Sequence, residues 1–232
     1  MHLFWRLNLL VLLLFLVLAP ISYFMDDQLF ILINQNMAHP DLDPIAEFAH
    51  DYVVPIHLLF MVVPLVCLYA YGTLRMYSMK KAIILLLILI LTFLALYLIH
   101  YVTMDMIKET VLRPRPYLDS ELDARIISPL SAAHDYRSFP SRAASSSFFM
   151  FSVIIYLLHK SSESMKLPKY LIPVVIICGF ALALLRAYSR AYLGHHYPSD
   201  IVSGAIFGLL FSFVSVMVIE RVGARRILHL LS

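Results

Sequence analysis

The sequence predicts an all-α, polytopic membrane protein that crosses the bilayer with six helices. Its 232 residues are 61% hydrophobic and only 14% charged, and the mean hydropathy is +0.82. A typical soluble domain is roughly 45 to 50% apolar and about 25% charged. The apolar residues also fall into blocks long enough to cross a hydrocarbon core about 30 Å thick. These observations argue against a soluble globular protein.

Six apolar blocks define the predicted spans. They cover residues 7–24, 53–71, 82–101, 143–158, 170–186 and 201–219. Several are shorter than the roughly 20 residues of a perpendicular span, but Tyr and Trp at block ends can lie in the interface and lengthen them. The first block follows Arg6 and has the charge pattern of a signal peptide. Residues 19–22 (Ala-Pro-Ile-Ser) make a poor cleavage site, so we expect a retained helix.

No internal repeat, Gly/Ser linker or charge block divides the chain, so we predict one membrane domain over residues 1–232. Cys67 and Cys178 lie inside apolar blocks, and two such cysteines support neither a disulfide framework nor a cysteine metal site. The net charge of +3 is not gathered into the basic patch that nucleic-acid binding requires. We therefore expect the lipid bilayer, and not nucleic acid, as partner. The sequence carries no signal of an oligomeric state.

The distribution of Lys and Arg predicts the orientation. If six spans alternate, ten basic residues share the side of the N-terminus: Arg6, Arg75, Lys80, Lys81, Lys160, Lys166, Lys169, Arg221, Arg225 and Arg226. The other eight lie opposite, where segment 25–52 has no Lys or Arg and six acidic residues. By the positive-inside rule both termini are cytoplasmic. The excess of ten basic residues over eight supports this orientation if some of the eight outer residues are retained for chemistry and not for topology. Because glycosylation and disulfide signatures are absent, a bacterial inner membrane is the simplest location.

Three polar stretches lie at helix ends on the outer side, at residues 108–116, 139–145 and 189–200. Lys108, Arg115 and Arg190 within them supply the fixed positive charge that a phosphoryl site needs. Guanidinium groups suit bidentate contact with phosphate. Ser141 and the N–H groups at the start of the fourth span add a helix N-terminus of the kind that binds anions.

A histidine and a carboxylate complete this set. Pro198 suits the first turn of a helix and so places Asp200 in that turn, four residues after His196. A carboxylate there can hold one imidazole nitrogen and leave the other to attack phosphorus. The outer side supplies Lys and Arg where a metal site would need converging Asp, Glu or His ligands. We therefore expect neither a metal nor another cofactor.

The spacing of these residues resembles the type 2 phosphatidic acid phosphatase family of membrane lipid phosphatases. Lys, six residues and Arg-Pro occur at 108–116, Pro-Ser at 140–141, and Ser-Arg, five residues, His, three residues and Asp at 189–200. The resemblance implies a six-helix fold over nearly the whole chain, a metal-free mechanism and a phosphohistidine on His196. It implies a site built from loops 106–142 and 187–200, with His196, Asp200 and Arg190 as catalytic residues and Lys108, Arg115, Ser141 and also Arg190 as phosphate ligands. We expect Arg142, next to Ser141, to bind phosphate as well.

The second motif departs from the family pattern. The family commonly reads Pro-Ser-Gly-His, and this chain reads Pro-Ser-Arg-Ala at residues 140–143. A general acid contributes roughly 10² to 10⁴ in rate and matters most for a poor leaving group. A diphosphate expels a lipid phosphate, whose second pKa is near 6 as for other phosphate monoesters. The departure therefore favours an isoprenoid (undecaprenyl-type) diphosphate or related phospholipid. Alternatively, His134 or His195 replaces the acid, or activity is lost.

Two other functions remain open from the sequence. A lipid phosphotransferase would use the same half-reaction, and a non-enzymatic lipid-binding or transport protein would tolerate the incomplete motif.

Simpler interpretations apply to the remaining polar and aromatic residues. We expect Arg113 to be structural. Six histidines are expected to lie at the membrane interface: His39, His50, His57, His100, His159 and His229. Ser145, Ser146 and Ser147 are expected to start a helix, and contact with the substrate is the less favoured alternative for these serines. Phe148, Phe149 and Phe151 are expected to pack or face lipid, and segment 26–51 to form a short interfacial helix or an ordered loop.

Overall fold

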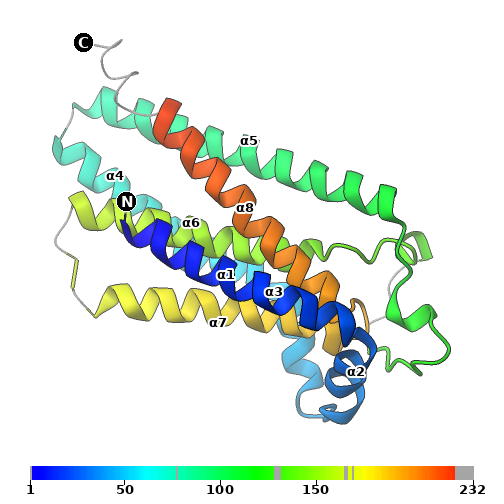
Figure 1. Cartoon of the computed structure of the whole chain (residues 1–232). Coiled ribbons are helices and arrows are strands. Elements are labelled where there is room, and N and C mark those ends of the chain that lie inside the picture. The colour runs from blue at the N-terminus through cyan, green and yellow to red at the C-terminus, as the bar shows by residue number, and fades with distance from the viewer. Residues whose placement is uncertain (1, 77, 128–131, 165–166, 169, 223–232) are drawn as a thin grey trace.

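The computed structural model describes residues 2–76, 78–127, 132–164, 167–168 and 170–222, and all regular secondary structure in these ranges is helical. Figure 1 shows a bundle of long helices with short ones at one end. The elements are α1 (His2–Phe24), α2 (Asp26–Ile31), η1 (Leu32–Asn36), α3 (Asp43–Ile56), η2 (His57–Val62), α4 (Val63–Met76), α5 (Met79–Val111), η3 (Pro116–Leu118), η4 (Ala132–His134), α6 (Arg142–Ser164), α7 (Leu171–Tyr192) and α8 (Pro198–Val222). Of the η segments, η1 and η2 are π-helical and η3 and η4 are 3₁₀.

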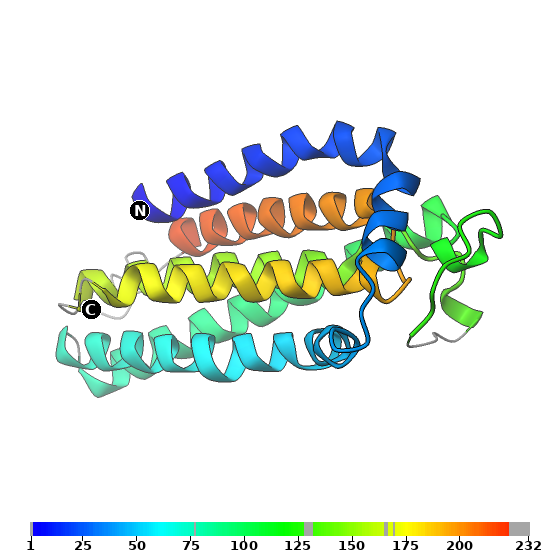
Figure 2. The same ribbon diagram turned by 90° about the horizontal axis from the view of Figure 1, so that it is seen from below.

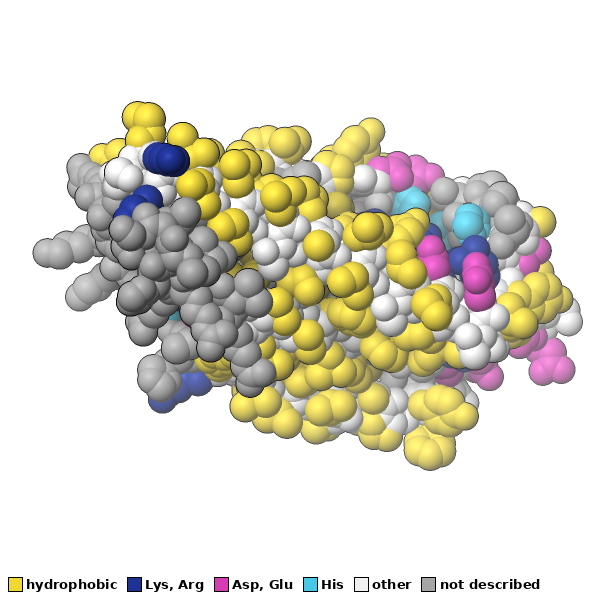
Figure 3. Space-filling model, turned by 90° about the horizontal axis from the view of Figure 1, so that it is seen from above, with side chains coloured by type: hydrophobic (Ala, Val, Ile, Leu, Met, Phe, Trp, Pro, Cys, Tyr) yellow, Lys and Arg dark blue, Asp and Glu magenta, His cyan; other side chains and the backbone are white. Residues whose placement is uncertain are grey.

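The described residues contain six helical stretches that are long and apolar enough to cross a membrane, which confirms the predicted fold class. They are α1, the continuous α3–η2–α4 segment, α5, α6, α7 and α8. Figure 3 shows hydrophobic side chains over the middle of one face, with acidic, basic and His side chains near one end. This is the surface of an integral membrane protein.

Several helices are longer than the spans predicted from hydropathy. The second span begins at Asp43 instead of residue 53, α5 continues to Val111 and α7 continues to Tyr192. Lys108 and Arg190 therefore lie in the last turns of helices and not beyond them. Hydropathy marks where contact with lipid ends, whereas the backbone hydrogen bonds of a helix continue wherever the protein satisfies its polar side chains.

Helix α6 is the central element of the bundle. Its apolar stretch is 78% buried, compared with 6% for α5. It packs against α1, α4, α7 and α8, and Figure 2 shows it between these helices. The side chains of Phe148, Phe149 and Phe151 are at most 1% exposed, so they pack in the core. The most enclosed helix thus begins directly after Ser141 of the second motif.

Two glycines bring α8 close to α6. A Cβ atom on Gly204 would lie 2.3 Å from the carbonyl oxygen of Ser141, and one on Gly208 would lie 2.1 Å from that of Ser145. This Gly-x-x-x-Gly spacing permits close approach of membrane helices. The Ser141 N–H donates to the Asp200 carbonyl at 2.9 Å. The starts of α6 and α8 are therefore fixed against each other.

The two ends of the bundle differ. Figures 1 and 2 show the start of α1 and the end of α8 at one end, and α2 with the long loop after α5 at the other. We call this second end, which also holds the starts of α6 and α8, the polar end. The short helix α2 lies in the predicted acidic segment, but Phe30 is fully buried against Leu122 and Tyr197. This helix is thus part of the protein's packing at the polar end.

Candidate active site

A cavity of about 280 Å³ brings the three sequence motifs together. Its wall is formed by His50, Val54, Tyr97, Tyr101, Lys108, Arg115, Arg142, Ala143, Ser146, Arg186, Arg190 and His196. Five of these side chains are Lys or Arg, and none of the described lining residues is acidic. Such a wall suits an anion. Of the predicted site residues, Ser141 and Asp200 lie behind the wall, and both are fully buried.

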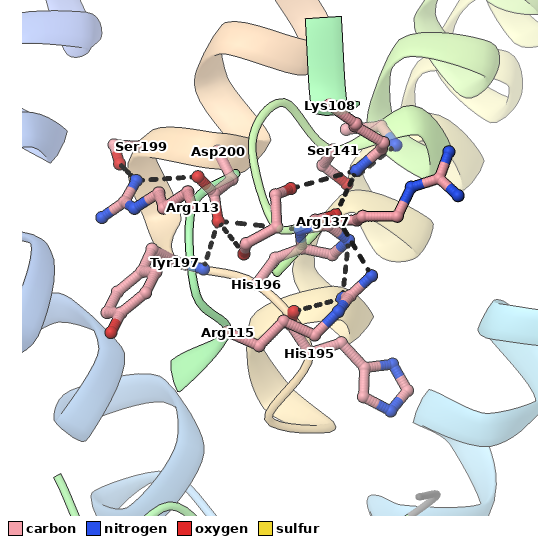
Figure 4. A network of polar contacts seen from close by, with 12 residues as sticks. Lys108, Arg113, Arg115, Arg137, Ser141, His195, His196, Tyr197, Ser199 and Asp200 are labelled. Atoms are coloured by element: carbon pink, nitrogen blue, oxygen red, sulfur yellow. Dashed lines mark hydrogen bonds and ion pairs between the residues drawn. The ribbon is translucent and has the colours of Figure 1, made fainter. Parts of the chain in front are cut away.

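His196 lies in the turn between α7 and α8 and is 2% exposed. Figure 4 shows its imidazole between Arg115 and Asp200. Its Nε2 atom is 3.3 Å from Nη1 of Arg115, and its Nδ1 atom is 3.6 Å from Oδ2 of Asp200. Burial, followed by the positive charges of Arg115 and Lys108, lowers the pKa of His196 well below its usual value. The imidazole is therefore neutral at pH 7 and keeps a nucleophilic nitrogen.

Asp200 accepts hydrogen bonds from three donors, and His196 is not one of them. Its Oδ1 atom accepts from Nη1 of Arg113 at 2.7 Å, and its Oδ2 atom accepts from the Ser138 hydroxyl at 2.5 Å and the Tyr197 N–H at 3.0 Å. The 3.6 Å separation from His196 is longer than a hydrogen bond. Catalytic hydrogen bonds are often long before substrate binds. The predicted contact between carboxylate and imidazole is thus electrostatic in this structure.

Arg113, which was expected to be structural, joins α2 to the start of α8. Its Nη2 atom donates to Oδ2 of Asp26 at 2.7 Å, and its guanidinium lies 4.1 Å from the centre of the Tyr197 ring. Asp26 also accepts from the Ser199 N–H at 2.8 Å. Asp26 cannot be recognised as part of this network from the sequence, because its partners are 87 and 173 residues away.

Backbone carbonyls hold the two cations of the first motif. Lys108 is 4% exposed, and its Nζ atom donates to the carbonyls of Arg137 at 2.6 Å and Ser138 at 3.2 Å. Arg115 donates through Nε to the His134 carbonyl at 2.8 Å and through Nη1 to the His195 carbonyl at 2.5 Å. Each charge is thereby fixed at the cavity, and no carboxylate among the described residues is hydrogen-bonded to it.

The second motif forms the start of α6. Ser141 precedes the helix, and its Oγ atom accepts from the Ala144 N–H at 3.4 Å. Arg142 lines the cavity and also donates to Asp105 at 2.8 Å. Ala143 lines the cavity as well, so the position of the missing histidine does face the site. Ser146 is also part of the wall, which favours contact with the substrate over a purely structural role for that residue.

The interfacial interpretation was wrong for three histidines. His57 and His100 are fully buried, with Nε2 atoms 3.1 Å from the Gly179 carbonyl and 2.6 Å from the Ser145 hydroxyl. His50 lines the cavity, where its ring contacts the Arg190 guanidinium. Their partners belong to other helices, which hydropathy along one helix does not reveal. His229 lies outside the described residues.

Neither suggested replacement acid lines the cavity in the described part of the chain. His134 lies in η4, and its carbonyl accepts from Arg115. The His195 ring packs against His50 with centroids 5.6 Å apart, and in Figure 4 it points away from Asp200. Arg186 does line the cavity and was missed, because it was treated as the end of the fifth span. An arginine within a membrane helix is itself a signal of a functional site.

The chain is similar to several known proteins. The family model described as the PAP2 superfamily matches residues 85–223. Two curated relatives, both named lipid A 1-phosphatase, come from Rhizobium johnstonii and Rhizobium etli. Each is 26% identical over 119 residues, which is 51% of this chain. The matches cover 43% and 45% of those proteins, so the chain spans less than half the length of these relatives.

Two crystal structures resemble the fold. LpxE from Aquifex aeolicus has a TM-score of 0.50 and 26% identity, covering 83% of this chain and 95% of that one. The first transmembrane PAP2 type phosphatidylglycerolphosphate phosphatase from Bacillus subtilis has a TM-score of 0.59. It shares 22% identity and covers 94% of this chain and 98% of its own, and this likeness concerns the fold alone. Because the family model matches more than half of the chain and includes all three motifs, the protein belongs to the PAP2 superfamily.

Proposed function

We propose that the chain is a membrane lipid phosphatase, a hydrolase of phosphoric esters or anhydrides that forms a phosphohistidine on His196. The observation that carries this proposal is the position of a buried, neutral imidazole in the wall of a cavity rich in cations. A neutral nucleophile and fixed positive charge are the two requirements of phosphoryl transfer through a covalent intermediate. The two relatives named lipid A 1-phosphatase support the same class of reaction.

The reaction has two steps. His196 Nε2 forms a bond to phosphorus, the bond from phosphorus to the leaving oxygen breaks, and the electron pair departs with that oxygen. Water then attacks the phosphohistidine, and inorganic phosphate leaves while Nε2 recovers its lone pair. Lys108, Arg115 and Arg190, with Arg142 beside them, neutralise the oxygens of the transferred group. Asp200 stabilises the positive charge that the imidazole gains when it is phosphorylated.

The substrate that fits best is a lipid diphosphate of the isoprenoid (undecaprenyl) type. Ala143 faces the cavity and offers no proton, and neither His134 nor His195 lines the wall. A departing lipid phosphate needs little protonation, whereas an alkoxide needs much. A phosphate monoester of a lipid is the second candidate, because relatives are named as lipid A 1-phosphatase and phosphatidylglycerolphosphate phosphatase.

We place the active site on the extracytoplasmic side of a bacterial inner membrane, within a single domain whose termini are cytoplasmic. The site residues lie at the polar end, opposite the start of α1 and the end of α8 (Figure 1). The Lys and Arg distribution assigns the other end to the cytoplasm. The similar proteins from Rhizobium johnstonii and Aquifex aeolicus support a bacterial membrane.

Phosphate release by the purified protein tests the function. The panel contains polyprenyl diphosphates, the matching monophosphates and phosphatidic acid, each with and without a lipid acceptor. We expect release without an acceptor, a trapped radiolabelled phosphohistidine in the wild type, and neither in His196→Ala. Turnover that requires a lipid acceptor would identify a phosphotransferase. Binding without turnover or phosphoenzyme would identify a lipid-binding protein.

A further inference from the structure

Arg186 is a fifth cation of the cavity, and no motif gives it a role. It lies within α7, four residues before Arg190, and it lines the cavity. Its Nε and Nη1 atoms are buried without a hydrogen-bond partner in the described part of the chain. Leaving two donor nitrogens of a buried charged group unpaired is costly. Such a group within a membrane span therefore indicates a ligand that completes it.

The surroundings of Arg186 favour an anion as that ligand. The neighbouring wall contains Tyr97 and Tyr101 of α5 and Val54 of α3. Asp51 attracts the guanidinium electrostatically, but its side chain is 59% exposed and does not line the cavity. Among the described residues, the wall offers no carboxylate to neutralise Arg186. Its charge is available to a bound molecule.

The position of Arg186 along α7 indicates which part of a substrate it meets. Residues four apart lie on the same face of a helix, about one turn or 5–6 Å apart. Since α7 runs towards the polar end and finishes at Tyr192, Arg186 lies one turn deeper in the bilayer than Arg190. Arg190 and His196 line the same cavity, so the proposed function puts the attacked phosphoryl group beside Arg190. A group on the lipid side of that phosphoryl group would then lie deeper, towards Arg186.

We propose that Arg186 binds a second phosphoryl group, joined to the attacked one through a bridging oxygen, and thereby makes the site selective for lipid diphosphates. This inference rests on the proposed function. As His196 Nε2 bonds to the terminal phosphorus, the bond from that phosphorus to the bridging oxygen breaks. The electron pair stays on the bridging oxygen, and the lipid monophosphate departs without taking a proton. Arg186 neutralises its added negative charge, which compensates for the proton donor that Ala143 lacks.

The test compares farnesyl diphosphate with farnesyl monophosphate as substrates of the full-length protein. In Arg186→Gln the ratio of the two kcat/KM values should fall by about 10- to 100-fold, since a hydrogen bond to a charged group is worth about 1.5–3 kcal/mol. Arg186→Lys should retain part of the preference. Lys160→Gln is the matched control, because it removes one cation near the other end of α6, where Lys160 pairs with Glu220 at 2.8 Å. Its ratio should equal that of the wild type.

A binding measurement separates the subsite from catalysis. Methylenediphosphonate should raise the Tm of the wild type more than methylphosphonate does, and Arg186→Lys should reduce that difference. If Arg186→Gln does not fold, this measurement decides, and equal protection by both phosphonates would overturn the inference. Equal losses on both farnesyl substrates in Arg186→Gln, or none, would overturn it as well.

The outcomes also distinguish this inference from the proposed function. Wild-type protein that releases phosphate from neither farnesyl substrate nor phosphatidic acid would refute the phosphatase itself. Release by the wild type with an unchanged ratio in Arg186→Gln would leave the phosphatase intact and remove the subsite. Preference for phosphatidylglycerolphosphate, whose second phosphate is separated by glycerol, over farnesyl diphosphate would rule out a directly bridged second group.

Discussion

The close approach of α6 and α8 predicts a large effect from a single methyl group. In Gly208→Ala the new Cβ atom would lie 2.1 Å from the Ser145 carbonyl oxygen and 3.1 Å from the Phe149 N atom. Ordinary contact for such an atom begins at about 3.4 Å. Both neighbours are backbone atoms, so no side chain can rotate away. The two helices must therefore separate by more than about 1 Å.

This separation acts on the site, because α6 carries Ala143 and α8 carries Asp200. A misplacement of about 1 Å can cost about 10²-fold in rate, which is about 2.7 kcal/mol of transition-state stabilisation. Overpacking of this kind also destabilises a fold by about 1–3 kcal/mol. We therefore expect Gly208→Ala to lower both kcat/KM and the Tm of the purified protein.

Gly179→Ala in α7 is the matched control. A Cβ atom there would lie 3.5 Å from a Phe151 side-chain atom and 3.7 Å from Ile154 and Met61 side-chain atoms, which is ordinary contact. Replacing a helical glycine with alanine favours the helix by up to about 1 kcal/mol, so this variant should keep wild-type activity with an equal or slightly higher Tm. If Gly208→Ala behaves like Gly179→Ala, the close helix approach does not position the site.

Four further predictions concern the chemistry and the topology. Chelation should leave turnover unchanged, because clusters of His, Cys, Asp or Glu able to hold a metal are absent from the described residues. Loss of activity that a divalent cation restores would contradict this. The plateau of kcat/KM should extend below pH 6.5, since burial and Arg115 lower the pKa of His196 and the neutral imidazole attacks. Activity is then lost only as falling pH protonates it, and an acid limb centred at pH 6.5 or above would refute the assignment. Single cysteines should react from outside at Asn36 and from inside at Ser162, and the reverse pattern would reject the orientation. Ala143→His should raise monophosphate turnover relative to diphosphate turnover. A wild type that turns over both equally fast would show that the missing acid does not set substrate choice.

Spacing along the chain predicted the site residues that lie within a few residues of one another in the sequence. His196 and Asp200 are four residues apart, and the six residues between Lys108 and the Arg-Pro pair cover the end of α5 and the start of the loop after it. Asp26 and His50 could not be predicted in this way, because their partners Arg113 and Arg190 come from distant helices or loops. Helix ends were also difficult, since hydropathy does not register turns whose polar side chains point into the protein.

Under the proposed function, the placement of the carboxylates explains how one site can both attract an anion and stabilise a phosphorylated histidine. An acidic residue in the cavity wall would repel the substrate, and the described wall contains none. Asp200 instead lies behind the imidazole, 3.6 Å from Nδ1. In the proposed mechanism its negative charge opposes the positive charge that the imidazole gains. Arg113 holds this carboxylate and Asp26 together at 2.7 Å each. The α2 segment, which carries none of the motifs, thereby helps to fix the negative charge behind the nucleophile.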